Sequence, residues 1–561
     1  MPFGYTGHYL RIGPPGTGKT TSIANQVAEA CSRATAAAWP GESPVCVCSL
    51  TRAAAAEAAG RDMPIPTDAV ATVHAHGYRL LGRPAVVDPD SVAEWNHLHP
   101  AYSLSPDQFA RRRTDDGYGD DLDTRLAGDH AGDDLYVQAD LLRHQLMPID
   151  DWDPAPRDFH QKWSAWKQHN GLVDFTDMIS QAPDVAPCGA GLVIVDEAQD
   201  CSALERRTID AWGRDAGAVV YVGDSYQALY TFRGADPDGM MAACTGDRRR
   251  VLEQSWRVPR AVHAAATAWV HNLSTWEPIE YRPRDADGHC GPLDTRSDDP
   301  QAAVQVAVET ARAGQTCMVV ATCGYMLGPI LAELRAAGVP FSNPWRTRRG
   351  DWNPLAKRAG TSASDRIVGL VRGCEADRIW TVQQLAAWLD PLEAARVLVR
   401  GAKTEIAEVV TAVGKADRHA TWDELVTWFQ PAALADLWSY AYGGGNDAPA
   451  RAQLVNWWSS NLRTAESRRF EYVLRVYQAL GLAGFEAPPK VYVGTVHSFK
   501  GGEADDVILF TDLSPAAQLA WDAGTGPGQD SVIRVGYVGM TRARERLFVA
   551  RAAGCGMSLL A

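Results

Sequence analysis

The chain has 561 residues, a length that predicts three or four structural units rather than one hydrophobic core. Its composition, with 46% hydrophobic and 22% charged residues, is typical of a soluble globular protein. No apolar run approaches the roughly 18 to 20 residues that a membrane span needs, and no signal peptide opens the sequence. We therefore expect no membrane partner and a cytoplasmic location, in a bacterium or in the host cytoplasm if the source is viral.

The formal net charge of −14 argues against a protein that coats nucleic acid through bulk electrostatics. That binding mode needs many Lys and Arg side chains to neutralise phosphates. The charge leaves open a narrow channel in which aromatic stacking and a few cations hold a single strand. Local patches therefore matter more than the total charge.

The eleven cysteines are an odd number without paired metal-type spacing, which indicates scattered buried thiols in a reducing cytoplasm. Cys46-Val47-Cys48 has the wrong spacing for a zinc knuckle and lies in a strand-like run. We therefore expect no zinc knuckle at this pair.

The first predicted elements are a short strand at residues 8–12, a glycine-rich loop, and a helix over residues 22–31. This loop pattern exposes backbone N–H groups to nucleotide phosphates at the N-terminus of a helix. Its lysine reaches the outer phosphates, and its last threonine hydroxyl meets Mg²⁺. The loop residues are Gly13, Pro14, Pro15, Gly16, Thr17, Gly18, Lys19 and Thr20.

The next elements are a strand at residues 45–50 and an alanine-rich helix at residues 52–61, an alternation that predicts a parallel α/β sheet. The pattern loosens from about residue 83 to residue 170, and residues 114–134 contain eight aspartates. We expect an inserted, mostly helical unit with an acidic solvated loop. The order of the aspartates does not fit the twelve-residue calcium loop.

A second apolar run, at residues 192–195, ends in two acids. Asp196 would stand at the C-terminal end of a buried strand, where α/β sheets present ligands, and is the natural Mg²⁺ partner of Thr20. Glu197 is then placed to orient or deprotonate the attacking water. The glycine loop and these acids together predict nucleoside-triphosphate hydrolysis.

The strand predicted at residues 218–222 leads to Gln227 and then to a run that interleaves aromatics with an arginine, at Tyr230, Phe232 and Arg233. This mixture suits a sensor that touches phosphate on one side and bases on the other. Taken alone, the two aromatic residues would more often belong to a core.

Further strands are predicted at residues 316–321, 491–493, 507–510 and 547–550, so two sheets would account for all the strands. Between residue 346 and about residue 489 the sequence is rich in tryptophan and helical in rhythm. We interpret this segment as a second insertion, into the second sheet. No internal repeat at a fixed period is found beyond the two-sheet duplication.

Two late runs, residues 493–503 and 537–544, complete an ordered set of motifs with which the chain closely resembles the UvrD/Rep/PcrA-type superfamily 1A DNA helicases. The resemblance covers roughly residues 1–82, 165–345 and 488–550. Supporting matches are Thr72-Val73-His74, the run Tyr78-Arg79-Leu80-Leu81, residues 174–177 and residues 252–257.

The resemblance implies an α/β fold with two RecA-like motor domains, each carrying an inserted, mainly helical subdomain. We expect the first, ATP-binding motor domain at residues 1–82 and 165–250, with its insertion at residues 83–164. The second motor domain is expected at residues 251–345 and 489–561, with its insertion at residues 346–488.

The resemblance also implies roles for individual residues, with ATP and Mg²⁺ as cofactors. Lys19 and Thr20 would bind phosphate and metal, Asp196 the metal, and Glu197 would be the base. The γ-phosphate would be sensed by Gln227, and Arg257 and Arg542 would stabilise charge on the transferred phosphoryl. Trp256 would stack on adenine and Glu503 would contact the ribose. The implied DNA contacts are His74, Tyr230, Phe232, Arg233, Thr495 and His497.

The chain departs from the family pattern in four places. No residue before Gly13 matches the family's glutamine motif, so the preference for ATP over other triphosphates stays open. Val73 replaces a base-stacking phenylalanine, and Gly502 and Ala504 replace a leucine and a phenylalanine. The segment 346–488 matches no motif.

The implied activity is 3′–5′ movement on single-stranded DNA with unwinding of duplex, in repair, recombination or replication. One alternative function is a DNA-stimulated ATPase that remodels nucleoprotein without processive unwinding. A second alternative is a helicase that acts on RNA instead of DNA. A helicase fused to a C-terminal nuclease domain is not expected, because the chain after Val549 leaves no room for one. Expected partners are single-stranded DNA, single/double-strand junctions and an unknown loading protein, with the chain a monomer or weak dimer.

Overall fold

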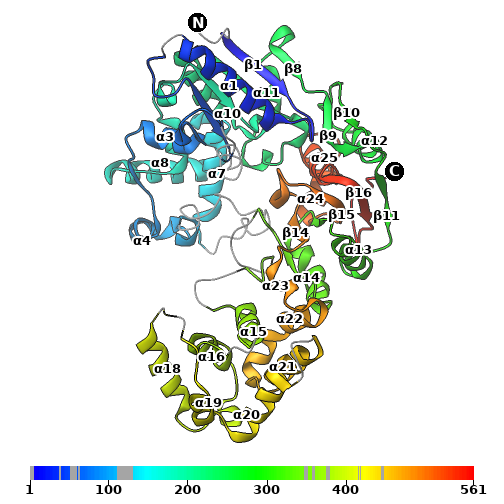
Figure 1. The fold of residues 1–561 in the computed structure, drawn as a ribbon. Coiled ribbons are helices and arrows are strands. Elements are labelled where there is room, and N and C mark those ends of the chain that lie inside the picture. The colour runs from blue at the N-terminus through cyan, green and yellow to red at the C-terminus, as the bar shows by residue number, and fades with distance from the viewer. Residues whose placement is uncertain are drawn as a thin grey trace. The chain divides into compact units, whose positions relative to one another are not determined.

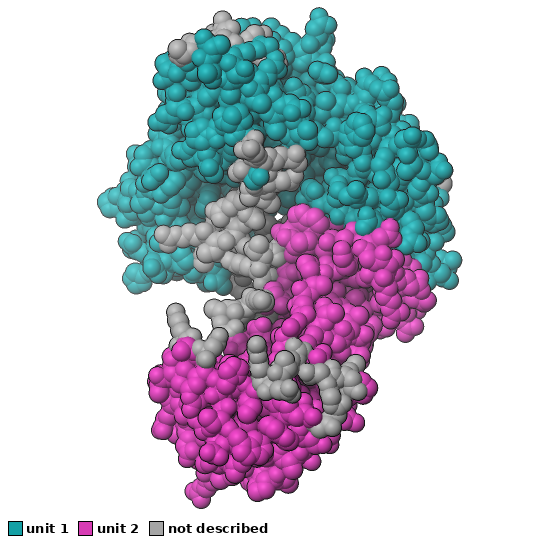
Figure 2. Space-filling model, viewed as in Figure 1, with its two compact units in different colours: residues 1–294, 320–324, 495–561 teal, residues 295–319, 325–494 magenta. Residues whose placement is uncertain are grey.

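A computed structural model describes residues 6–36, 39–50, 60, 63–109, 130–345, 352–356, 361–374, 379–414, 416, 418–443 and 448–560. The chain divides into two compact units (Figure 2). Unit 1 comprises Met1–Asp294, Val320–Gly324 and Thr495–Ala561, and unit 2 comprises Thr295–Val319 and Tyr325–Gly494. The helix predicted at residues 52–61 lies almost entirely outside the described residues.

Within the described residues, the first sheet has six parallel strands in the order β3-β2-β6-β7-β1-β8 (Figure 1). Every residue of β2, β6 and β7 is buried, as expected for central parallel strands that are covered on both faces. The strands predicted in this part of the chain are confirmed. Their bounds are β1 Gly7–Ile12, β2 Val45–Ser49, β3 Val70–Thr72, β6 Leu192–Val195, β7 Ala218–Gly223 and β8 Arg249–Val251.

Helices flank the first sheet (Figure 1). Helix α1 begins directly at the end of the glycine loop, three residues before the predicted start, and buries Ile23 and Val27 in one core cluster with Val45 and Val47. The opposite face of β2 packs in a second cluster that contains Trp212 of α10. The helices are α1 Lys19–Ala36, α3 Val73–Leu80, α9 Phe175–Ser180, α10 Ala203–Ala216 and α11 Pro237–Ala242.

The segment predicted as the first insertion, residues 83–164, contains α4 (Pro89–Leu98), α7 (Asp133–His144) and the start of α8 (Pro154–His169). Its strand β4 (Ala85–Val86) pairs in parallel with β5 (Leu172–Val173), which lies beyond the predicted boundary. Its core is aromatic, with Trp95, Phe159 and Trp163 packed together. The strands and helices therefore enclose a separate hydrophobic core.

Residues 110–129, most of the acidic run, lie outside the described residues, so the solvated loop stays a prediction there. The expectation is wrong for Asp133, which is buried in the first turn of α7. Its carboxylate accepts hydrogen bonds from the backbone N and the Oγ of Ser105, at 2.9 and 2.6 Å. These bonds satisfy the carboxylate, which is why an acid is tolerated inside.

The second sheet also has six strands in the described residues, in the order β11-β16-β15-β12-β14-β13. The strands predicted at residues 316–321, 491–493, 507–510 and 547–550 are confirmed, although β16 begins four residues earlier than predicted. The two-sheet α/β class is therefore correct. The strands are β11 His289–Leu293, β12 Cys317–Ala321, β13 Phe341–Ser342, β14 Val491–Thr495, β15 Ala504–Leu509 and β16 Ala543–Ala550.

Unit 1 also contains a two-stranded parallel sheet of β9 (Gln254–Pro259) and β10 (Arg282–Arg284). Helix α25 buries Ile533 and Tyr537, and Trp269 of α12 donates its indole N–H to the Ile533 carbonyl at 2.8 Å. These contacts fasten α12 to α25. The helices are α12 Arg260–Val270, α24 Pro515–Asp522 and α25 Pro527–Met540.

Unit 2 has a helical core built around tryptophan, as the sequence predicted. Trp380, Trp388 and Trp458 are fully buried in it, whereas Trp422 is 45% exposed. The helices are α13 Gln301–Arg312, α14 Leu327–Ala336, α15 Ala363–Arg372, α16 Val382–Leu389, α17 Ala394–Val397, α18 Ala402–Val413, α19 Trp422–Trp428, α20 Pro431–Trp438, α21 Ala448–Ser460, α22 Thr464–Leu480 and α23 Ala483–Glu486.

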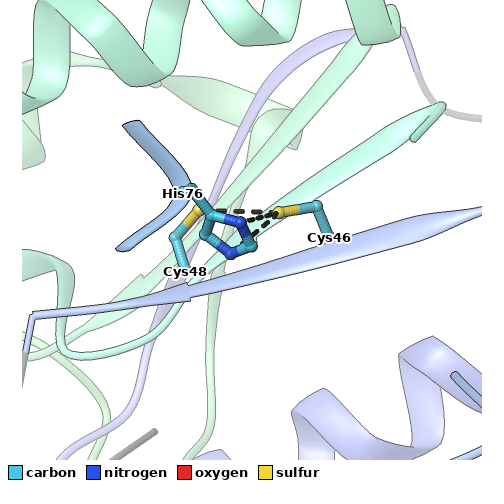
Figure 3. A group of neighbouring side chains, drawn as sticks. All are labelled: Cys46, Cys48 and His76. Atoms are coloured by element: carbon cyan, nitrogen blue, oxygen red, sulfur yellow. Dashed lines mark hydrogen bonds between the residues drawn. The ribbon is translucent and has the colours of Figure 1, made fainter. Parts of the chain in front are cut away.

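All eleven cysteines are free thiols. Six are buried, but Cys555 is exposed, so the prediction of buried thiols is wrong at that position. Cys46 and Cys48 lie in β2, as the strand-like pattern indicated, and face His76 of α3 (Figure 3). Among the described residues, no helix combines the length and the apolar character that crossing a membrane requires.

Candidate active site

The glycine loop connects β1 to α1, and its shape depends on glycine. Gly16 and Gly18 have φ angles of 73° and 79°, which L side chains rarely adopt. A Cβ atom on Gly13 would lie 2.2 Å from Cγ of Lys19. The Lys19 ammonium folds back over the loop and donates to the Gly13 carbonyl at 3.0 Å. The loop is therefore wrapped closely around the stem of its lysine.

Two acids follow β6. Asp196 is buried, and its Oδ1 accepts the Glu197 backbone N–H at 2.9 Å. Glu197 has a φ of 53°, a left-handed conformation that is unfavourable for a residue other than glycine. Its carboxylate oxygens lie 3.9 Å from Nζ of Lys19 and 3.8 Å from Nζ of Lys500. Strain of this kind is held where a site needs a side chain aimed in one direction.

Electrostatics keep the Glu197 carboxyl ionised. Burial acts to raise its pKa, but the charges of Lys19 and Lys500, with a hydrogen bond from Gln199, outweigh burial and lower the pKa to about 2. Asp200 behaves in the opposite way, because burial outweighs its ion pair with Lys500 and raises its pKa to about 6. A carboxylate that is charged at neutral pH can accept a proton from water.

Gln227 and Arg542 contact each other although 315 positions separate them. Nη2 of Arg542 donates to Oε1 of Gln227 at 2.9 Å, and Nε2 of Gln227 donates to Asp224 at 2.7 Å. Arg542 is 2% exposed, and burial together with Arg257 lowers its pKa. Its charge also acts on Glu197. The guanidinium therefore belongs to the same electrostatic neighbourhood as the acid.

Strand β9 lies against the glycine loop. The Trp256 backbone N–H donates to the Gly16 carbonyl at 2.8 Å, and Ser255 Oγ donates to the Pro15 carbonyl at 2.9 Å. Arg257 follows, and its Cβ would be only 2.4 Å from a Cβ placed on Gly16. The structure thus brings both predicted arginines to the loop and acids. Trp256 is 72% exposed, so its indole presents an open stacking surface.

Glu503, the predicted ribose contact, forms ion pairs in this structure. Its carboxylate accepts from Nε of Arg257 at 2.6 Å and from Nη1 of Arg544 at 3.0 Å. Glu503 therefore lies beside Arg257. Thr20 is half-buried in the first turn of α1, at the end of the loop.

Three of the predicted DNA residues form an aromatic cluster. The ring centroids of Tyr230, Phe232 and His497 lie 6.1 to 6.2 Å apart. The Arg233 guanidinium lies over two of these rings, at 4.8 Å from the Tyr230 centroid and 5.5 Å from the Phe232 centroid. All four side chains are half-buried. Such a surface can stack bases and hold a phosphate.

The other two predicted DNA residues lie outside this cluster. His74 packs against Phe175, with ring centroids 5.9 Å apart. Thr495 is fully buried, and its hydroxyl accepts the Ser498 N–H at 3.3 Å. In this conformation Thr495 has no surface to offer a ligand.

Lys500 is a site residue to which sequence reasoning gave no role. Its ammonium forms ion pairs with Asp200 and Glu197 and lies 5.2 Å from the centroid of the Tyr230 ring. Lys500 therefore contacts both the acids and the aromatic cluster. Its place in the motif run at residues 493–503 was the available signal, but spacing alone does not show which distant carboxylate it meets.

The comparisons with known proteins agree with this geometry. Residues 6–233 match the model of an AAA domain, and residues 490–550 match the UvrD-like helicase C-terminal domain. The chain therefore carries the AAA and UvrD-like C-terminal domains of superfamily 1 helicases. The P-loop of the AAA domain implies nucleotide binding.

Three relatives show how distant the similarity is. The chain is 26% identical over 255 residues to the ATP-dependent DNA helicase UvrD2 of Mycobacterium tuberculosis, a match covering 40% of this chain and 35% of the relative. It is 27% identical over 138 residues to the RecBCD enzyme subunit RecB of Mycolicibacterium smegmatis, a match that covers 21% of this chain and 13% of the relative. It is 38% identical over 72 residues to the RecBCD enzyme subunit RecB of Mycobacterium tuberculosis, a match that covers 13% of this chain and 7% of the relative. The matches therefore span about a third or less of each relative.

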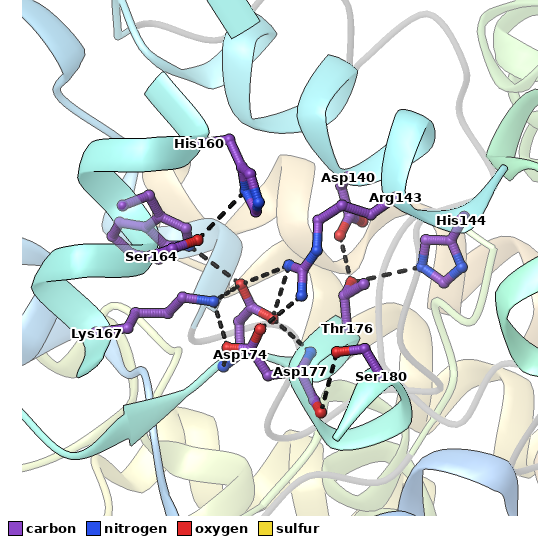
Figure 4. Close-up of polar contacts among 11 residues, drawn as sticks. Asp140, Arg143, His144, His160, Ser164, Lys167, Asp174, Thr176, Asp177 and Ser180 are labelled. Carbon is purple, nitrogen blue, oxygen red and sulfur yellow. Dashed lines mark hydrogen bonds and ion pairs between the residues drawn. The ribbon is translucent and has the colours of Figure 1, made fainter. Parts of the chain in front are cut away.

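The helicase motif at residues 174–177 forms a buried ionic network (Figure 4). Asp174 and Asp177 cap the start of α9 reciprocally, and both form ion pairs with Arg143 of α7 and Lys167 of α8. Arg143 lies 3.2 Å from Asp174 and 2.5 Å from Asp177. The network thus ties helices of the predicted first insertion to α9.

This network predicts acid sensitivity. Burial acts to raise the pKa of Asp174, but Lys167 and Arg143 outweigh it and hold the pKa well below 3.8. A depressed pKa contributes stability above pH 3.8 that is lost as the pH falls toward the folded-state pKa. Asp174→Asn removes one of the two buried carboxylates that pair with Arg143 and Lys167. We therefore expect it to lower the free energy of unfolding by about 3–5 kcal/mol at pH 7. Denaturant unfolding at several pH values measures both effects.

The control for Asp174→Asn is Asp158→Asn, which removes an ion pair to Lys162 at the surface of α8. This variant is expected to unfold like the unmodified chain, because exposed pairs contribute little. Equal unfolding of the two variants would show that the buried network does not stabilise the fold.

Proposed function

We propose that this chain is a Mg²⁺-dependent ATPase that moves 3′–5′ along single-stranded DNA and unwinds duplex. The observation that carries the proposal is the convergence of Lys19, Glu197 and Arg542 from three distant parts of the sequence, with Arg257 beside the loop. A lysine for the phosphates, an ionised base and arginines for the transferred phosphoryl are the groups that phosphoryl transfer needs.

We assign the parts of the reaction to the residues as follows. The loop N–H groups and Lys19 bind the β- and γ-phosphates, and Glu197 takes the proton of the attacking water. Gln227, held by Asp224 and Arg542, senses the γ-phosphate, and Arg257 and Arg542 stabilise the charge that builds on it. The Trp256 indole stacks on the base, and Glu503 turns to the ribose when Arg257 turns to phosphate.

The Thr20 hydroxyl and the Asp196 carboxylate would hold Mg²⁺, since hard oxygen donors suit this cation. The buried position of Asp196 after β6 fits the role. Bound Mg²⁺ would neutralise charge on the phosphate oxygens.

The motor domains are proposed as predicted, residues 1–82 with 165–250 and residues 251–345 with 489–561. Support for coupling hydrolysis to DNA comes from Lys500, which contacts Glu197, Asp200 and the ring of Tyr230. A strand stacked on this ring changes the surroundings of Lys500 and so the field at the base. Differential contacts of this kind let nucleotide shift the populations of DNA-binding states.

A tailed-duplex assay tests the proposed function. DNA duplexes with a 3′ tail are expected to be unwound with ATP and Mg²⁺, whereas 5′-tailed DNA and RNA duplexes are not. Adding GTP, CTP and UTP in parallel measures the triphosphate preference that the missing glutamine motif leaves open. DNA-stimulated hydrolysis without strand separation would favour the remodelling ATPase instead.

A variant of the aromatic cluster tests the DNA surface. Tyr230→Ala is expected to weaken single-stranded DNA binding by roughly 5- to 150-fold, since stacking of one base contributes about 1–3 kcal/mol. Fluorescence anisotropy with a labelled oligonucleotide measures the change. Tyr325→Ala, which removes an exposed tyrosine of unit 2, is the control and is expected to bind normally. Equal affinity of both variants would remove Tyr230 from the DNA surface.

A further inference from the structure

A cluster of soft donor side chains lies at the first sheet, on strand β2, which neighbours the strand β6 that leads to Asp196. Cys46 and Cys48 are two positions apart in β2 and therefore point to the same face of the strand. His76 reaches them from α3 (Figure 3). Within the described ranges, these three side chains are the group of Cys, His or acidic residues whose ligand atoms all lie within 4.8 Å of one another. All three are buried.

The distances match those of a metal site. The two Sγ atoms are 3.8 Å apart, and Sγ of Cys46 is 3.3 Å from Nε2 of His76. A tetrahedral Zn²⁺ with Zn–S near 2.3 Å and Zn–N near 2.0 Å places two sulfurs about 3.8 Å apart and sulfur and nitrogen about 3.5 Å apart. These two distances therefore need little adjustment, and the ligand atoms of Cys48 and His76 lie within 4.8 Å of each other. Sequence reasoning looked for paired-cysteine spacing and missed the histidine.

We propose that Cys46, Cys48 and His76 form a structural site for Zn²⁺. Two thiolates and a neutral imidazole leave the complex without net charge, which suits a buried position better than an unbalanced ion. Thiolate and imidazole are also the ligands that Zn²⁺ prefers. The three side chains supply three ligands, and a water molecule would complete the tetrahedron.

Binding has a definite proton balance. Cys46 and Cys48 are free thiols, and each S–H gives its proton to solvent as a zinc–sulfur bond forms, so one Zn²⁺ releases two protons. Burial raises the pKa of Cys46 well above its usual value, which favours its thiol form before zinc binds. Burial lowers the pKa of His76 to about 4, so its ring is already neutral and contributes no proton.

The surroundings of His76 must rearrange slightly. Arg79 donates to Nδ1 of His76 at 3.3 Å, and Nε2 lies 3.3 Å from the Val47 carbonyl. Zinc at Nε2 moves the ring proton to Nδ1 and ends the bond from Arg79, which keeps its bonds to the carbonyls of Asp68 and Ala75. Bound zinc would join β2 to α3.

Zinc titration of the full chain tests the proposal. After removal of metals with a chelator, the chain is titrated with Zn²⁺ against a chromophoric competitor in weakly buffered solution. One Zn²⁺ per chain and two protons released per zinc are expected. The double variant C46A/C48A is expected to bind at least about 100-fold more weakly. Cys244→Ala, which changes a buried thiol outside the cluster, is the control and should bind like the unmodified chain.

A second measurement needs no variant. Co²⁺ in place of Zn²⁺ is expected to give intense thiolate-to-cobalt absorption corresponding to two sulfur ligands, and Zn²⁺ should raise the midpoint of thermal unfolding. Absence of stoichiometric Zn²⁺ binding, or binding without sulfur absorption, would overturn the proposal. Equal zinc affinity in a folded C46A/C48A variant would overturn it too, as would binding of Cu⁺ with no binding of Zn²⁺.

Discussion

Glu197→Gln is expected to lower DNA-stimulated nucleotide hydrolysis by roughly 10²- to 10⁴-fold, because the amide does not accept a proton from the attacking water. Nucleotide binding should persist, since the loop and Lys19 are unchanged. Glutamine has nearly the same shape as glutamate, so the substitution leaves the left-handed backbone conformation at this position, with φ 53°, unchanged. Steady-state hydrolysis with saturating single-stranded DNA and equilibrium binding of a fluorescent nucleotide measure the two properties separately.

Lys19→Ala is the companion to this variant. It removes the cation that reaches the phosphates and lies 3.9 Å from Glu197, so both hydrolysis and nucleotide affinity are expected to fall. The contrast separates loss of the base from loss of the phosphate ligand. Retained turnover in either variant would mean that the catalytic centre is assigned to the wrong residues.

The second large effect is expected at Arg542. Arg542→Ala should slow hydrolysis by about 10³- to 10⁵-fold, the range that such arginines contribute in other nucleotide hydrolases. Nucleotide binding is expected to change little, because the loop supplies most ground-state contacts. Single-turnover hydrolysis, compared with nucleotide affinity, measures the difference between transition-state and ground-state effects.

The control for Arg542 must separate chemistry from folding, because this side chain is 2% exposed and donates to the Val538 and Gly502 carbonyls. Arg542→Lys keeps a cation but not the guanidinium fork, so its unfolding should stay close to that of the unmodified chain while hydrolysis stays slow. A normal rate in a folded Arg542→Ala variant would assign the transition-state charge to another group.

Much of the fold and part of the site could be predicted from local patterns. The loop at residues 13–20 and the acids Asp196 and Glu197 were recognisable because their chemistry depends on neighbours within a few positions. The strands were recognisable as continuous apolar runs, because central parallel strands are buried on both faces. Burial on both faces leaves no polar alternation, so the run itself is the signal.

Expectation and structure differ where a residue's environment depends on distant parts of the chain. Asp133 looked like part of a solvated acidic loop, yet Ser105 binds its buried carboxylate. Thr495 matched a DNA motif, yet its side chain is enclosed. The residues that flank Asp133 do not indicate its partner Ser105, and the residues that flank Thr495 do not indicate that its side chain is buried.

The sequence by itself determined which chemical groups this protein has and which element carries each one, because turn geometry and strand burial are short-range properties. Only the tertiary structure decided which groups meet. Gln227 and Arg542, Asp200 and Lys500, and Cys46 and His76 are neighbours in space at separations of 315, 300 and 30 positions. Such contacts depend on the order of the strands in each sheet and on the packing of the helices. Both are set by the burial of the whole core rather than by any single motif.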